Sequence, residues 1–119
     1  MSDLELDFQR LVDEIRAELD KRGIEFQFRT YGNIPGRKYS FKAPKTFAWV
    51  YKKPRLDCLA VGTKQEWADK AGIEDYQYKP HSQFNRPGAH WKISEGDITS
   101  RQKIIRYLIR VCKARHSDI

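Results

Sequence analysis

The spacing of apolar side chains changes at Gly23 from a helical repeat to strict alternation, and this change constrains the fold more than any other feature. Before Gly23, apolar residues recur at spacings of three and four, which predicts one amphipathic helix over residues 3–22. The apolar stripe of this helix consists of Phe8, Leu11, Val12, Ile15 and Leu19. After Gly23, apolar and polar residues alternate through Arg29, which predicts a strand with one buried face.

The rest of the chain continues as short alternating segments and ends in a second amphipathic helix. Turn-forming sequences such as "YGNIPG" and "KKPR" separate the segments, so we expect the strands to pair as an antiparallel meander. The predicted strands cover residues 24–29, 38–42, 46–51, 56–61 and 89–93. We expect a short helix over residues 63–72 with Thr63 as its N-cap, a long loop or irregular edge strand over 73–88, and the last helix over 98–114.

These elements predict a single α+β domain over residues 1–119. We expect about four to six antiparallel strands, with the two terminal helices packed on one face of the sheet. The sequence contains no internal repeat and no linker that would divide it, and a chain of 119 residues can form its own apolar core.

Charge is distributed unevenly along the sequence. Residues 1–25 contain four Lys/Arg and eight Asp/Glu, a net charge of −4, whereas residues 26–119 contain nineteen and eight, a net of +11. The segment 26–56 has eight cations and no acid. A positive excess confined to part of a chain is typical of a surface that faces a polyanion, although a purely solubilising role is the alternative.

The sequence "RKYSFKAPKTFAWVYKKPR" combines seven of these cations with five aromatic residues. Because alternate side chains of a strand point to opposite faces, we expect the rings to pack beneath the helices and the cations to face outward. This arrangement predicts contact with nucleic-acid phosphates. The candidate contacts are Lys38, Lys42, Lys45, Lys52, Lys53 and Arg55 of the hairpin, with Arg86 and Arg106.

Each candidate has another interpretation. Lysines and prolines on a hairpin also discourage edge-to-edge pairing of sheets, and cations near the C-terminus of a helix complement its dipole. In the polar segment "YQYKPHSQFNRPGAHW", Arg86 could extend a phosphate-contacting patch, whereas His90 has the context of a hydrogen-bonded structural histidine.

The segment "KYSFKAPKTFAWVYKKPRLDCLAV", followed by "GAHW" and a closing helix, resembles the MmcQ/YjbR-like group of small bacterial domains. It also resembles a related uncharacterised domain, sometimes labelled a predicted transport protein, that is found attached to nucleases. The matching positions are Lys45, Phe47, Ala48, Leu56, Leu59, Gly88 and Trp91. The resemblance implies an α+β fold with a curved antiparallel sheet; in the first family, this surface has been proposed to bind DNA through paired hairpin wings. This sequence departs from both groups in its very basic 37–55 segment.

Motifs for catalysis are absent from the sequence. It has no P-loop, no dinucleotide fingerprint, no nucleophile context and no Asp followed by Glu-x-Lys on an adjoining strand. His81 and His90 have no cysteine or carboxylate at ligand spacing. The sequence therefore predicts no catalytic residue, no metal site and no cofactor, and an enzyme acting on a small ligand is the third hypothesis.

The ends of the chain and its cysteines bear on location. The acidic start lacks the apolar region of a signal peptide, and no apolar run approaches the roughly 18 residues that span a bilayer. Cys58 and Cys112 lie far apart in apolar segments, so we expect two buried free thiols. These features predict a cytoplasmic protein that does not contact a membrane.

The leading hypothesis from the sequence is a small nucleic-acid-binding module that contacts phosphates through its basic hairpin. The alternative is a protein-interaction or accessory module without affinity for nucleic acid. Its contact surfaces would be the acidic first helix and the edge strands of the sheet.

Overall fold

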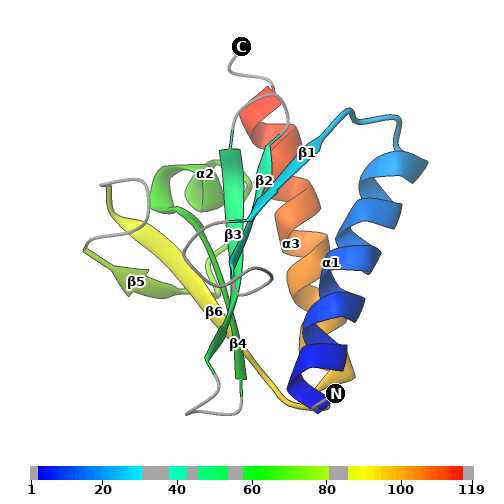
Figure 1. Ribbon diagram of the computed structural model, residues 1–119. Coiled ribbons are helices and arrows are strands. Elements are labelled where there is room, and N and C mark those ends of the chain that lie inside the picture. The colour runs from blue at the N-terminus through cyan, green and yellow to red at the C-terminus, as the bar shows by residue number, and fades with distance from the viewer. Residues whose placement is uncertain (1–2, 31–37, 43–45, 54–57, 81–85, 117–119) are drawn as a thin grey trace.

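The computed structural model describes residues 3–30, 38–42, 46–53, 58–80 and 86–116, in which two long helices cover one face of a six-stranded sheet (Figure 1). The helices are α1 (Asp3–Lys21), α2 (Gln65–Lys70) and α3 (Ile98–His116). The strands are β1 (Gln27–Thr30), β2 (Lys38–Lys42), β3 (Thr46–Lys53), β4 (Cys58–Lys64), β5 (Gln77–Lys79) and β6 (Gly88–Ser94).

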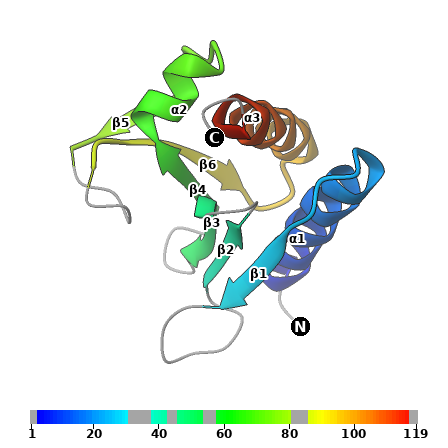
Figure 2. The same cartoon turned by 90° about the horizontal axis from the view of Figure 1, so that it is seen from above.

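The strands pair antiparallel in the order β1-β2-β3-β4-β6-β5. Strand β5 forms one edge of the sheet, where the sequence predicted a long loop or an irregular edge strand. Figure 2 shows α1 and α3 side by side on one side of the sheet, with α2 next to α3. The predicted α+β fold with its terminal helices on one face is therefore confirmed.

Helix α1 ends where the sequence predicted. Gly23 has a φ of 68°, a left-handed conformation that glycine adopts without strain. Its backbone N–H donates to the carbonyl of Asp20, and the N–H of Ile24 donates to that of Leu19 at 3.0 Å. These bonds satisfy carbonyls at the helix end and turn the chain back toward β1.

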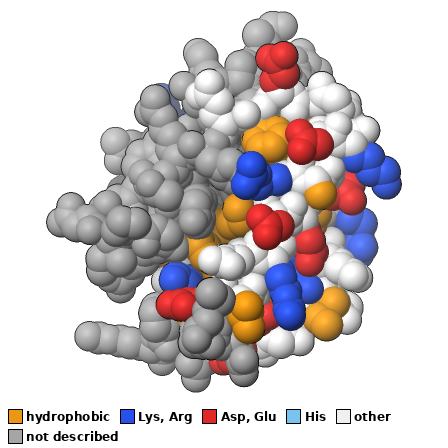
Figure 3. All heavy atoms as spheres, turned by 45° about the vertical axis from the view of Figure 1, so that its right-hand side comes forward, with side chains coloured by type: hydrophobic (Ala, Val, Ile, Leu, Met, Phe, Trp, Pro, Cys, Tyr) orange, Lys and Arg blue, Asp and Glu red, His pale blue; other side chains and the backbone are white. Residues whose placement is uncertain are grey.

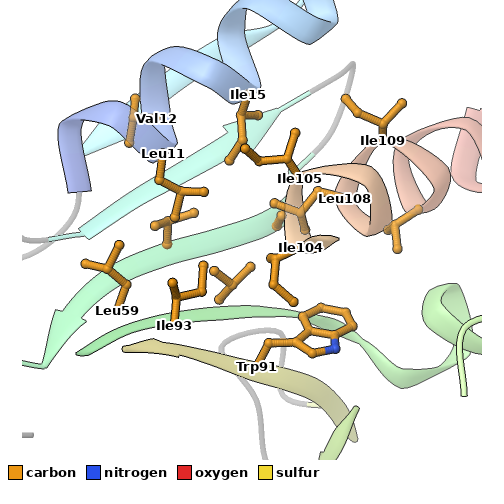
Figure 4. Packing of buried hydrophobic residues seen from close by; sticks show 14 of the residues in the cluster. Leu11, Val12, Ile15, Leu59, Trp91, Ile93, Ile104, Ile105, Leu108 and Ile109 are labelled. Atoms are coloured by element: carbon orange, nitrogen blue, oxygen red, sulfur yellow. The ribbon is translucent and has the colours of Figure 1, made fainter. Parts of the chain in front are cut away.

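The core lies between the helices and the middle of the sheet. Val50, Val61 and Trp91 are cross-strand neighbours on β3, β4 and β6, and cross-strand neighbours share a face. Figure 4 shows the helix residues pointing toward this layer, with Leu11 on α1 and Leu108 on α3. The apolar stripes of both helices are thus buried against the same sheet face.

A β-bulge at the start of β3 changes which rings join this core. Phe41 pairs with Ala48 and Lys42 pairs with Thr46, so Phe47 is an extra residue in β3. Phe47 and Ala48 are both fully buried in the core. The bulge explains how two successive residues of one strand can both contribute to the core.

Beyond the bulge, the alternation places side chains differently from the sequence prediction. Lys52 lies on the side of the helices, with its ammonium group 5.3 Å from the ring centroid of Phe8. Trp49 and Tyr51 occupy the alternate positions and therefore lie on the opposite face, beside Gly62 and Ala60 of β4. The expectation that all rings of this strand pack beneath the helices is therefore wrong for Trp49 and Tyr51. The face that each ring takes depends on how β3 pairs with β4, which the local sequence does not specify.

The start of α2 also differs from the prediction. Lys64, not Thr63, is the N-cap of this helix, and it makes no side-chain cap. Thr63 is the penultimate residue of β4, and its hydroxyl donates to the carbonyl of Phe47 at 2.6 Å. The hydroxyl that could have capped the helix therefore joins two strands instead.

A buried ion cluster joins the two long helices. The guanidinium of Arg101 on α3 lies 3.6 Å from the carboxylate of Asp7 and 3.1 Å from that of Glu14, both on α1. Asp7 also accepts a hydrogen bond from the backbone N–H of Gly96 at 2.6 Å. The side chains of Asp7 and Arg101 are about nine-tenths buried, so each charge depends on its partner for the solvation that water would supply.

We expect Asp7→Ala to lower the free energy of unfolding by about 3 kcal/mol, because it leaves Arg101 under-compensated in a buried position. Glu14→Gln is the matched control: the carboxylate of Glu14 is 38 % exposed, so its loss should cost about 1 kcal/mol or less. Urea denaturation of both variants measures the difference. Equal losses for the two variants would contradict the role given to the buried carboxylate.

Candidate functional site

The face of β3, β4, β5 and β6 that points away from α1 and α3 is here called the open face (Figure 2). Strand register places its residues in cross-strand rows, one of which runs from Trp49 through Gly62 and His90 to Gln77. By this register, the described residues of the open face are Trp49, Tyr51, Lys53, Cys58, Ala60, Gly62, Lys64, Gln77, Lys79, Gly88, His90, Lys92 and Ser94. Trp49, Cys58, Ala60 and His90 are buried on this face, whereas Lys92 is exposed and Tyr51, Lys53 and Lys79 are partly exposed.

Three lysines on the open face come from three different strands and influence one another electrostatically. Lys53, Lys79 and Lys92 are referred to as the lysine cluster. Partial burial lowers the pKa of Lys79, and the positive charges of Lys53 and Lys92 lower it further. The ammonium group of Lys53 also lies 5.7 Å from the ring centroid of Tyr51. The charges that lower the pKa of Lys79 repel its ammonium group, and an anion near the three lysines would relieve this repulsion.

No described carboxylate forms an ion pair with the lysine cluster. The reason lies in the sequence, because the six strands contain eight Lys/Arg and no Asp or Glu. The eight are Arg29, Lys38, Lys42, Lys52, Lys53, Lys64, Lys79 and Lys92. The described acids lie in the helices and connections, and one of them, Glu66 of α2, lies 3.8 Å from Lys64 at the end of β4.

His90 lies in the middle of the open face and is 7 % exposed. Its ring lies over Gly62 of the adjacent strand: a Cβ at Gly62 would stand 2.9 Å from Cε1 and 3.0 Å from Nε2 of His90. Only a residue without a side chain leaves room for the imidazole there. The Nε2 atom is buried, and none of the described residues forms a hydrogen bond with it.

The surroundings of His90 hold its ring neutral. Burial lowers the pKa of His90 to about 4, and the positive charges of Lys79 and Lys53 contribute to the shift. At neutral pH the imidazole therefore carries one N–H donor and one acceptor nitrogen. The site combines positive charge from the lysine cluster with a neutral and buried imidazole ring.

The opposite side of the molecule has a different charge pattern. Lys52 lies 3.9 Å from Glu5 of α1, and Arg106 lines a groove of about 460 Å³ between α1 and α3 that also contains Glu14 and Glu18. Figure 3 shows acidic and basic side chains intermixed on the side that carries α1. Lys103 on α3 is likewise paired with an acid, Asp75.

The eight candidates from the sequence therefore do not form one surface. Lys53 is on the open face, Lys52 is on the helix side and Arg106 is between the helices. Arg86 is exposed and lies just before β6. The structure pairs the backbone of Lys38 with Tyr51 and that of Lys42 with Thr46 and describes neither side chain, while Lys45 and Arg55 lie outside the described residues.

Sequence reasoning missed Lys79, Lys92 and His90 as members of the site. The alternation of "AHWKI" does place His90 and Lys92 on one face, away from Trp91 and Ile93. The Trp91 ring lies 5.7 Å from that of Tyr107 on α3, which fixes the direction of that face. Nothing local indicates that Lys53 and Lys79 lie near this pair, because their approach depends on pairing between distant segments.

The described part of the chain has no arrangement of residues that would form a metal site or a membrane-spanning helix. No group of three His, Cys, Asp or Glu side chains there could hold a metal ion. Cys58 and Cys112 are buried and are not joined in a disulfide, as the sequence predicted. None of the described helices has the length and apolar character needed to cross a membrane.

Comparisons of the chain with protein-family models, with curated proteins and with solved structures found no match. The resemblance to the MmcQ/YjbR-like group therefore stays a prediction from short motifs. Function has to be inferred from the open face itself.

We expect Gly62→Ala to destabilise the protein by about 1–3 kcal/mol, because the new methyl group would displace the His90 ring. The double variant Gly62→Ala/His90→Ala removes the ring that the methyl group meets, so it should be more stable than the sum of the single changes implies. Chemical denaturation of the four proteins in this cycle gives the coupling. Strict additivity would contradict the close packing of these two residues.

We expect the contribution of His90 to stability to depend on pH. The contribution should be complete above about pH 6.5, the ordinary pKa of histidine, and should fall by about 3 kcal/mol as the pH decreases to about 4. The sign follows because the unfolded chain binds the proton more tightly than the folded protein. His90→Gln removes the titrating group, so the difference between the unfolding free energies of the two proteins isolates the effect. Parallel pH profiles for the two proteins would contradict it.

Proposed function

We propose that this protein binds single-stranded nucleic acid on the open face, with the lysine cluster contacting phosphates. The observation that carries the proposal is the electrostatic effect of Lys53 and Lys92 on Lys79, on a face whose strands contain no acid. A nucleic-acid backbone supplies several negative charges at regular spacing, and its binding releases counterions.

The distribution of cations between the helix side and the open face supports the open face as the binding surface. On the helix side, Lys52, Arg101 and Lys103 each have an acidic partner within the chain, so they are neutralised locally. On the open face, the lysine cluster has no described acidic partner. A role limited to solubility would not require three strands to bring their ammonium groups together.

The presence of Tyr51 favours a single strand over a duplex. Tyr51 is half-buried on the open face, with the ammonium group of Lys53 near its ring. Surfaces that bind single strands combine a cationic track with aromatic rings that stack on bases. The flat face of a sheet presents such rings in register, which is the arrangement that several RNA-binding modules use. The cytoplasmic location expected from the sequence is compatible with such a ligand.

Neighbouring lysines of β3 provide the sharpest test. Lys53→Gln should weaken binding of a thymidine oligonucleotide and reduce the salt slope by about 0.7, the value for one phosphate contact on a single strand. Lys52→Gln makes the same change one residue away, on the helix side, and should leave affinity and slope unchanged. Fluorescence anisotropy at several salt concentrations measures both.

The triple variant Lys53→Gln/Lys79→Gln/Lys92→Gln should reduce the salt slope by about 2. Wild-type protein that does not bind the oligonucleotide at low salt would contradict the proposal. Equal effects of Lys52→Gln and Lys53→Gln would also contradict it, because they would place the ligand elsewhere. If the protein does not bind nucleic acid and forms a stable complex with another protein, the result would favour the accessory-module alternative.

A further inference from the structure

We infer that the groove between α1 and α3 is a second binding site, which takes a small molecule with an apolar body and one carboxylate. The guanidinium of Arg106 holds the carboxylate, and the apolar body lies against isoleucines of α3. This site is on the helix side of the molecule, so it does not depend on the proposed binding of nucleic acid to the open face.

The two long helices form the walls of the groove. They lie side by side and run in the same direction along the sheet (Figure 1). Glu14, Ala17, Glu18 and Lys21 line the groove from α1, and their spacing of three and four residues places them on one face of that helix. The volume of about 460 Å³ lies within the range of pockets that hold small molecules.

The groove contains apolar surface between its polar walls. Ile105 and Ile109, one turn apart on α3, line it together with Ala17 of α1. The two isoleucines are also part of the core, with exposed fractions of 6 % and 4 %, so they form a base whose position is fixed. Ala17 is exposed, and its small side chain leaves room above this base. The apolar part of a ligand can therefore be removed from water there.

Both acids of the groove have partners within the chain. The carboxylate of Glu14 lies 3.1 Å from the guanidinium of Arg101. Glu18 accepts a hydrogen bond from Arg22, and this bond, together with the positive charge of Lys21, lowers the pKa of the Glu18 carboxyl. The two carboxylates are thus ionised and paired at neutral pH.

The positive charge of the groove is not matched in this way. No described carboxylate forms an ion pair with Lys21 or Arg106. Arg106 is exposed and is the next residue after Ile105, so a cation stands beside the apolar base. A guanidinium binds a carboxylate through two parallel hydrogen bonds, a geometry that the ammonium group of lysine does not match.

Other cations of α3 have a partner within the fold. Arg101 is paired with acids of α1, and the ammonium group of Lys103 lies 2.9 Å from the carboxylate of Asp75. Arg110 donates a hydrogen bond to the carbonyl of Ala71 at 2.6 Å. Among the described residues, Arg106 has no partner of either kind, so its guanidinium is available to a ligand.

The test uses octanoate and 2-naphthoate, a linear and a flat apolar carboxylate, with isotope-labelled wild-type protein. NMR signals of the Ile105 and Ile109 methyl groups should shift and saturate, with a Kd of about 1 mM or lower for the better probe. Octan-1-ol has the chain without the charge, and acetate has the charge without the chain. Each should bind at least about tenfold more weakly than octanoate. The better carboxylate shows whether the site prefers an acyl chain or a ring system.

Variants of the two walls locate the probe. Arg106→Gln should weaken binding of the better probe about threefold to tenfold, because it removes the guanidinium that holds the carboxylate. Lys103→Gln is the matched control: it removes a cation from the same helix that is paired with Asp75, and it should leave the Kd unchanged. Ala17→Trp fills the groove from an exposed position of α1 and should weaken binding at least about tenfold.

Three results would overturn the inference. These are methyl signals of Ile105 and Ile109 that do not saturate with either carboxylate, equal affinity for octanoate and octan-1-ol, and equal losses in Arg106→Gln and Lys103→Gln. The first two need only the wild-type protein, so the test does not depend on how well a variant folds. None of these results affects the proposed function, because they concern the opposite side of the molecule.

Discussion

The pleat of the central strands is the constraint on which the rest of the structure depends. Successive side chains of β3, β4 and β6 point to opposite faces, so each strand contributes one set of residues to the helices and another to the open face. Val50, Val61 and Trp91 form the buried row, and their neighbours Tyr51 and Lys92 form the other surface. A shift of one residue in register would exchange the two sets and destroy both the core and the open face.

Charged residues are also distributed differently between the helix side and the open face. The acids of α1 lie where they can pair with cations of the helix side, and one such pairing, Asp7 with Arg101, is buried between α1 and α3. The strands contribute cations without acids, and no described acid forms an ion pair with Lys53, Lys79 or Lys92. Fold and electrostatics therefore give the molecule two unlike sides: a helix side of mixed charge (Figure 3) and a sheet face that is positive. The proposed nucleic-acid ligand is inferred from the positive sheet face.

Local patterns in the sequence were sufficient for the helices and for most of the strands. The spacing from Phe8 to Leu19 and the stop at Gly23 predicted α1 almost to the residue. The bulge at Phe47 could not be predicted, because it arises from the register between β2 and β3. For the candidate site, local patterns proposed both Lys53 and Lys52 as contacts, but the pleat turns Lys52 to the other face. The approach of Lys79 to Lys53 depends on β5 pairing with β6 and β6 with β4, which no local pattern specifies.

The central claim is that the ligand surface is the open face and not the helices. Backbone amide shifts of isotope-labelled protein, followed by NMR as a thymidine oligonucleotide is added at low salt, locate the contact directly. The account predicts that the largest changes occur at Lys53, Gly62 and Lys92, with α1 and the outer side of α3 unaffected. Changes concentrated on α1 and α3, or no changes at all, would contradict it.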